Sequence, residues 1–229
     1  MSKAFGHYWE QSFAFLWAGS IFHGAVTECL KNASVGSSAL GLPMLNGGLA
    51  ARVSKHFGHM MAVSAVDNFN SFLSELVLEV LEKDPRPLSG KQFPVKAILE
   101  HNDINELKRS VVEKFIVDLG YQNINDLSEF LSKNFGIKSL NGSLTRLRLS
   151  RLIQIRNVIT HNRGVVNGVF LNRSQSKRDK LEDLVWVPHP VRLSGYLTGL
   201  VRAIDDEATT KFQLEESDWK VAWDVKINA

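Results

Sequence analysis

The chain has 229 residues, of which 44% are apolar and 22% are charged, the proportions of an ordinary globular protein. Its single cysteine, Cys29, excludes an intrachain disulfide and a cysteine-based zinc site, and we expect a reducing compartment such as the cytoplasm. The N-terminal segment lacks the basic and apolar regions of a signal peptide, and no apolar segment predicts a membrane span.

Two long helices are predicted in the first half of the chain. Residues 4–31 form the first, and a loop rich in Gly, Ser and Ala at 32–48 separates it from the second at 49–81. In the second helix, apolar residues that repeat every three or four positions predict a buried face: Val66, Phe69, Leu73, Leu76, Val77 and Val80. Pro85 and Pro87 end this helix.

The second half of the chain also has helical patterns. We predict a helix from an N-cap at Asp103 to Gly120, a short helix at 126–135 that ends at Gly136, and a last helix at 191–212. A basic helix at 143–161 should direct five apolar side chains inward: Leu144, Leu147, Leu152, Ile155 and Ile159.

The remaining segments predict little regular structure. Residues 165–190 are expected to form a loop with a short strand at 184–187, and the tail should be extended because apolar residues alternate over 219–225. The sequence therefore predicts an all-α fold, a single-domain helical bundle over 1–229 with minor extended segments near the C-terminus. Its core covers about 49–212, and the helix at 4–31 and the tail at 213–229 pack on that core.

The basic residues are concentrated in one part of the chain. The formal net charge is +3, yet outside residues 130–178 there are 17 basic against 24 acidic residues. That segment is either a solvated basic face or a surface that binds phosphate groups. It has no Asp or Glu and holds ten of the 27 basic residues: Lys133, Lys138, Arg146, Arg148, Arg151, Arg156, Arg163, Arg173, Lys177 and Arg178.

The end of the basic helix carries a distinctive set of polar side chains. The sequence LIQIRNVITHNRGVV, residues 152–166, places Arg156, Asn157 and His161 just before the expected helix end. This pattern resembles the signature of HEPN domains, which are helical bundles defined by an Arg, a polar residue and a later His. The segment Phe72–Leu76 on the earlier long helix and the segment AIDDEATTKF at 203–212 also look like HEPN proteins of prokaryotic toxin and defence systems.

The resemblance implies a metal-independent endoribonuclease that needs no cofactor. Such domains usually form homodimers, in which two copies of the motif meet across one cleft. RNA would be the substrate, and an antitoxin or another protein is a possible partner. RNA carries its own nucleophile, the 2′-hydroxyl, so the protein must supply a base, an acid and positive charge near the phosphate.

The resemblance also assigns roles to individual residues. His161 would be the general acid or base, because histidine titrates near neutral pH. Arg156 would hold the phosphate, and Asn157 would orient the imidazole or the phosphate. Three further arginines are expected to contact the RNA backbone: Arg148, Arg151 and Arg163.

Helix geometry restricts how these residues can meet. At about 100° per residue, Asn157 and His161 lie about 40° apart, whereas Arg156 and His161 lie about 140° apart. Arg156 and His161 can converge if the last helical turn frays, or if the arginine reaches across a dimer axis. Gly164 predicts a helix end near Asn162, which allows the first arrangement.

Other interpretations of the motif remain open. The same helix end could form a cap without catalysis, with Arg156 paired to Asp205 or Asp206. The protein could then be a non-catalytic dimeric module that binds RNA, a nucleotide or a protein. A third alternative, a DNA-binding helix, conflicts with the many apolar residues of the basic helix.

Several other polar or aromatic residues have simpler explanations. His56 and His59 are three residues apart but lack a third metal ligand, so we predict a helix surface and no metal site. His189, between two prolines, is expected in a rigid loop. The acidic run at 205–207 predicts a solvated face, and packing is preferred over base stacking for three tryptophans: Trp186, Trp219 and Trp223.

Overall fold

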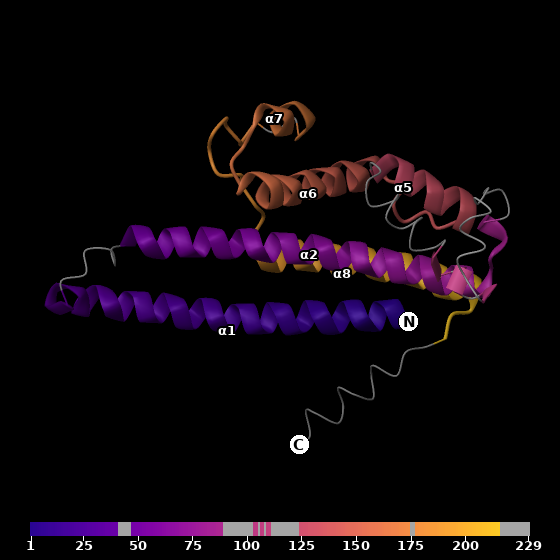
Figure 1. Cartoon of the computed structure of the whole chain (residues 1–229), viewed down its shortest axis with the longest axis horizontal. Helices are drawn as coiled ribbons and strands as arrows, with labels where there is room; N and C mark the ends of the chain where they lie inside the picture. The colour runs from indigo at the N-terminus through magenta and orange to yellow at the C-terminus, as the bar shows by residue number, and fades with distance from the viewer. Residues whose placement is uncertain are drawn as a thin grey trace, which may run out of the picture. The chain divides into compact units, whose positions relative to one another are not determined.

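The computed structural model describes residues 1–40, 47–88, 103–104, 106–107, 109–110, 124–174 and 177–215 (Figure 1). Within these ranges the secondary structure is helical, apart from one isolated antiparallel bridge between Val165 and Leu184. The all-α prediction is therefore confirmed, and the predicted strand at 184–187 is reduced to that bridge.

The two long N-terminal helices are present, but the first is longer than predicted. Helix α1 covers Lys3–Leu40 and helix α2 covers Gly47–Lys83, so the loop predicted at 32–40 is wrong. Ala, Leu and Ser are tolerated in helices at small cost, and among these nine residues only Gly36 has a penalty of about 1 kcal/mol. As predicted, α2 stops before Pro85, and a short 3-10 turn, η1, follows at Arg86–Leu88.

Two predicted segments lie largely outside the described residues. The helix expected from Asp103 to Gly120 is described only at a few positions near its start, which are helical and include a bond from the Leu107 N–H to the Asp103 carbonyl. The extended tail from Trp219 to Val225 is not described at all.

The later helices agree with prediction except at one point. Helix α5 covers Ile124–Phe130 and continues into a π-helical turn, η2, at Leu131–Phe135, which ends at the left-handed Gly136 as predicted. Helix α6 covers Ser143–Asn162, and helix α8 covers Pro190–Phe212. Helix α7 at Gly168–Ser174 was not predicted, although Asn167 caps it by accepting the Phe170 N–H at 2.9 Å.

The predicted inward face of α6 is partly wrong. Leu144 and Leu147 are 56% and 63% exposed, whereas the helix buries Leu149, Leu152, Ile155 and Val158. Apolar residues surround α6 on several sides, so its sequence periodicity does not select one face. The neighbouring segments decide which of these side chains are covered.

The chain divides into two compact units, each assembled from segments that are distant in the sequence. Unit 1 comprises Met1–Trp9, Asn68–Ser150 and Thr198–Ala229, and unit 2 comprises Glu10–Asp67 and Arg151–Leu197. Unit 1 has an apolar core whose largest fully buried side chains include Phe69, Phe72, Leu131, Phe135 and Ile204.

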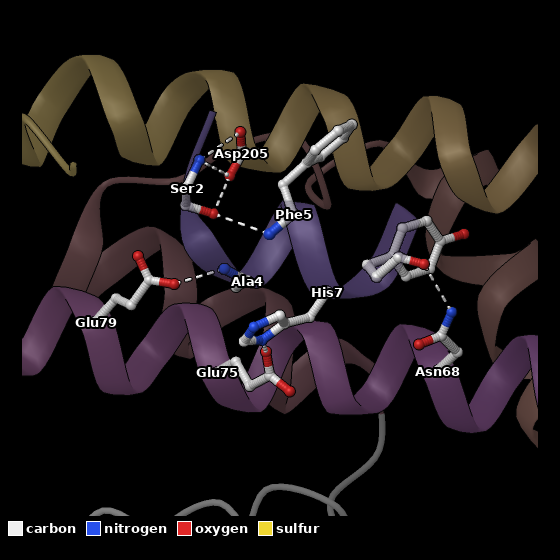
Figure 2. A network of polar contacts seen from close by, with 9 residues as sticks. Ser2, Ala4, Phe5, His7, Asn68, Glu75, Glu79 and Asp205 are labelled. Carbon is white, nitrogen blue, oxygen red and sulfur yellow. Dashed lines mark hydrogen bonds and ion pairs between the residues drawn. The ribbon is translucent and has the colours of Figure 1, made fainter. Parts of the chain in front are cut away.

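A polar network in unit 1 joins the start of α1 to α2 and α8 (Figure 2). The buried Asp205 carboxylate accepts the Ser2 backbone N–H and hydroxyl, and Glu79 accepts the Ala4 N–H at 2.6 Å. Asn68 donates to the Tyr8 carbonyl at 3.1 Å. Burial raises the pKa of both Asp205 and Glu79, because a charged carboxylate loses hydration there.

The acidic run at 205–207 is therefore not the predicted solvated face. Only Asp206 is exposed, since Asp205 is fully buried and Glu207 accepts the Lys138 N–H at 2.5 Å and the Ser139 hydroxyl at 2.6 Å. The pairing considered between Arg156 and this run is also not found. Asp205 and Glu207 instead form structural hydrogen bonds within unit 1.

In unit 2, the second half of α6 is part of a separate apolar cluster. Ile155 and Val158 of α6 are buried against three residues from the following segments: Val166, Phe170 and Val185. Helix α1 also packs closely on α2 in this unit, because a Cβ atom at Gly19 would lie 3.0 Å from the Met61 sulfur. None of the helices in the described ranges is long and apolar enough to span a membrane.

Candidate functional site

The motif helix ends at a turn that is fixed by hydrogen bonds and close packing. Helix α6 stops at Asn162, and Arg163 and Gly164 both adopt left-handed conformations with φ of 54° and 78°. The Gly164 N–H donates to the Val158 carbonyl at 3.0 Å, and the Val165 N–H donates to the Asn162 carbonyl at 2.9 Å. This turn confirms the helix end expected from Gly164.

Gly164 is required here for a second reason, its contact with a buried histidine. A Cβ atom at this position would lie 2.7 Å from the His59 ring. His59 is 3% exposed, and its Nε2–H donates to the Val185 carbonyl at 3.1 Å. Burial lowers the pKa of His59, which favours the neutral ring that this packing requires.

The prediction that His56 and His59 lie on a helix surface is therefore correct only for His56. His56 is exposed, whereas His59 is part of the support beneath the motif turn. In the described part of the chain, no group of three His, Cys, Asp or Glu side chains is arranged to hold a metal ion. His189 lies directly before α8, and its side chain is exposed at the surface.

Arg156 is oriented by two neighbours. Its Nε–H donates to Asp67 of α2 at 2.8 Å, and its Nη1 donates to the Asn157 side-chain oxygen at 3.3 Å. The Arg156 side chain is 30% exposed and the Asp67 side chain 44% exposed. The guanidinium is thus held at Nε and at Nη1, while its other N–H groups can still bind an anion.

Asn157, which was expected to orient the imidazole or the phosphate, contacts Arg156 in this structure. Its oxygen accepts a hydrogen bond from Arg156, so Asn157 orients the arginine in this structure. Asp67 has a similar function, and sequence reasoning missed it because Asp67 is 89 residues away from Arg156 and belongs to no motif. Only the packing of α2 beside α6 brings the two side chains together.

His161 lies in the last turn of α6 with an exposed side chain. None of the described residues forms a hydrogen bond or ion pair with its ring. Because α6 stays helical through Asn162, the last turn does not fray, and Arg156 and His161 still differ by about 140° around the axis. The first of the two predicted ways for them to converge is therefore not realised within this chain.

The three arginines expected to contact RNA differ from one another. Arg163 is exposed and has no partner among the described residues, whereas Arg148 is exposed but belongs to unit 1. Arg151 donates to Asp179 at 2.8 Å, and the Asp179 side chain is only 1% exposed. Arg151 therefore stabilises a buried carboxylate, and its removal would leave that charge uncompensated.

The basic segment at 130–178 is less positive than its sequence suggests. Carboxylates from outside it or from its border pair with at least three of its ten cations: Lys133 with Glu129, Arg151 with Asp179, and Arg156 with Asp67. In unit 2, the cations of this segment that follow Asn162 have exposed side chains: Arg163, Arg173, Lys177 and Arg178.

Comparisons with protein-family models, with curated proteins and with solved structures found no match to this chain.

Proposed function

We propose that this protein is a metal-independent endoribonuclease of the HEPN type, a toxin or defence effector of the cytoplasm that acts as a homodimer. The observation that carries the proposal is the end of α6. There, Arg156 is fixed by Asp67 and Asn157, and His161 is exposed one turn further along the helix face that bears Asn157. These are the residue types that RNA cleavage requires.

The chemistry uses the 2′-hydroxyl of the substrate as the nucleophile. One histidine removes the hydroxyl proton, and the oxygen attacks the neighbouring phosphorus atom. The bond to the 5′-oxygen breaks, and an acid returns a proton to that leaving oxygen. Arg156 stabilises the negative charge on the phosphate oxygens, and the products are a 2′,3′-cyclic phosphate and a free 5′-hydroxyl.

The first test is cleavage by the purified protein and by His161→Ala. We expect wild type to cut single-stranded RNA in excess EDTA and to leave 2′,3′-cyclic phosphate ends. His161→Ala should reduce the rate by about 10²–10⁴-fold but retain RNA binding, since the surrounding cations remain. Loss of wild-type activity in EDTA, with recovery on adding magnesium, would contradict this mechanism.

The second test addresses the homodimer. In one chain Arg156 and His161 diverge by about 140°, so we propose that the reactive pair comes from two chains related by a two-fold axis. Arg156→Ala and His161→Ala should each be inactive alone. A mixture of the two should regain measurable activity, because a mixed dimer retains one intact pair across the interface.

The controls for this experiment are simple. Light scattering at micromolar concentration should show a dimer for wild type and both variants. A mixture of either single variant with a chain that carries both substitutions should stay inactive. A monomer, or dimers whose mixtures never regain activity, would contradict the two-chain site.

A non-catalytic binding module is the alternative that one observation favours. Asp67 already pairs with Arg156 in the isolated chain, as expected for an arginine with only a structural role. Equal RNA binding by wild type and His161→Ala, with no cleavage by either, would support this alternative. An antitoxin or other protein partner would then be sought by its effect on RNA binding.

A further inference from the structure

Trp186, for which packing in the core or at an edge was expected, is an exposed tryptophan beside the motif turn. It is 44% exposed, and the Arg178 guanidinium carbon lies 4.9 Å from the centre of its ring. An aromatic ring that is accessible to solvent and stacked with an arginine is the kind of surface on which nucleic-acid bases stack.

The segment that carries this ring is held rigidly. The buried Asp179 carboxylate accepts the Trp186 backbone N–H on one oxygen and an Arg151 N–H on the other, both at 2.8 Å. These bonds fix the backbone at Trp186 and position the loop that carries Arg178. Because the tryptophan contributes its backbone N–H, a change of its side chain leaves this arrangement intact.

The same segment is joined directly to the end of the motif helix. The Val185 N–H donates to the Gly164 carbonyl at 2.7 Å, and the Val166 N–H donates to the Asp183 carbonyl at 2.8 Å. Val185 is fully buried between Gly164 and His59, and in an extended segment the next side chain points to the opposite side. The pairing therefore places the Trp186 ring on the outer surface, next to the turn that follows His161.

We propose that Trp186, with Arg178, is a stacking subsite for an unpaired base of single-stranded RNA. This inference rests on the proposed function, because it assigns the ring to the substrate of the α6 site. Glu182 and Asp183 are exposed in the same loop and partly offset the charge of Lys177 and Arg178. The loop is therefore poorly suited to hold phosphates by charge alone, and base stacking is the interaction that the ring supplies.

The experiment measures RNA binding in the His161→Ala background, so that the probe stays intact. A fluorescein-labelled single-stranded RNA of mixed sequence and its duplex are titrated by anisotropy. Trp186→Ala should weaken single-strand binding by about tenfold or more, whereas Trp186→Phe should retain most of it. Duplex binding should be unchanged, because paired bases cannot stack on the ring.

Two further readouts separate stacking from other effects. Trp17→Ala is the matched control. Trp17 of α1 is also an exposed tryptophan, at 63%, but it lies outside the segment that carries Trp186. Trp17→Ala should bind RNA as tightly as the parent, which is the His161→Ala protein. Single-stranded RNA should also quench the tryptophan fluorescence of the parent, and this quenching should be smaller in Trp186→Phe, a variant that keeps an aromatic ring and the fold.

The outcomes distinguish this inference from the proposed function. If the Trp186 variants bind and quench like the parent, the stacking subsite is wrong, even if the protein with His161 cleaves RNA. If single-strand binding depends on Trp186 but the protein that retains His161 does not cleave RNA, the ribonuclease is wrong and the subsite stands. Absence of RNA binding by every variant overturns both. Loss of self-association in Trp186→Ala with unchanged RNA binding would make this surface a protein interface and overturn the subsite.

Discussion

Arg156 donates its Nε–H to Asp67, and under the proposed function the effect of this contact on cleavage can be separated from its effect on stability. Ion pairs with exposed partners contribute about 0–1 kcal/mol, and both side chains here are at least 30% exposed. The pair therefore matters more for the direction of the guanidinium than for folding. A small displacement of a catalytic group can reduce a rate greatly.

Asp67→Ala should consequently reduce RNA cleavage by about 10- to 100-fold through kcat, while the melting temperature hardly changes. Asp67→Glu should restore part of the rate, because it keeps a carboxylate on the same helix. Glu10→Ala, which removes another exposed carboxylate of unit 2, is the control for the change in net charge. Equal rates for Asp67→Ala and wild type would show that Asp67 does not position Arg156.

At the scale of the element, α6 depends on the turn that ends it. Two consecutive left-handed residues, the bond from Gly164 to Val158 and the contact with His59 all fix this turn. His59 also binds the segment that continues to Trp186, so one buried histidine supports both the motif turn and the stacking subsite.

Gly164→Ala should therefore destabilise unit 2. The left-handed conformation costs a residue with a side chain about 1 kcal/mol, and the added methyl group would also press against the buried His59 ring. We expect a lower midpoint in urea unfolding and lower RNA cleavage. Gly168→Ala is the matched control, because a Cβ atom at Gly168 meets nothing within 4 Å. Similar stabilities for the two variants would contradict the packing argument.

At the scale of the whole molecule, four helices, α1, α2, α6 and α8, contribute residues to both units. Unit 1 contains the buried Asp205 and the half-buried Glu79, and unit 2 contains the motif, Asp67 and the Trp186 subsite. The stability of unit 1 and the chemistry of unit 2 can therefore be perturbed by different substitutions.

The stability of the protein should depend on pH because of Asp205. Burial raises its pKa above the usual 3.8, so the folded state binds this proton more tightly than the unfolded state. The resulting stabilisation is complete below pH 3.8 and is lost as the pH rises through the folded pKa. Each pKa unit corresponds to about 1.4 kcal/mol.

Asp205→Asn removes this titration and keeps an oxygen that can accept the Ser2 bonds. The free energy of unfolding of wild type minus that of the variant should therefore fall as the pH rises from about 4 to 7. Urea unfolding at several pH values measures this difference. Asp206→Asn, a change of the exposed neighbour, should show a smaller trend. A difference for Asp205→Asn that grows with pH would reverse the sign and contradict the argument.

The sequence by itself determined most of the described helices and the end of the motif helix. Periodic apolar residues predicted α2 and α8, prolines stopped α2, and Gly136 and Gly164 marked two helix ends, because these signals act within a few residues. The same local reasoning failed at 32–40, where weak propensities did not break the helix, and it overlooked the cap at Asn167.

Only the tertiary structure decided which polar groups meet. Asp67 pairs with Arg156, which is 89 residues away in the sequence, and Asp205 binds Ser2, which is 203 residues away. His59 likewise lies beneath Gly164. No local sequence pattern predicts these long-range contacts. The face of α6 was likewise chosen by its neighbours, which exposed Leu144 and Leu147 and buried Val158. Burial and long-range pairing depend on how several segments pack together, so they followed from the assembled structure and not from any one stretch of sequence.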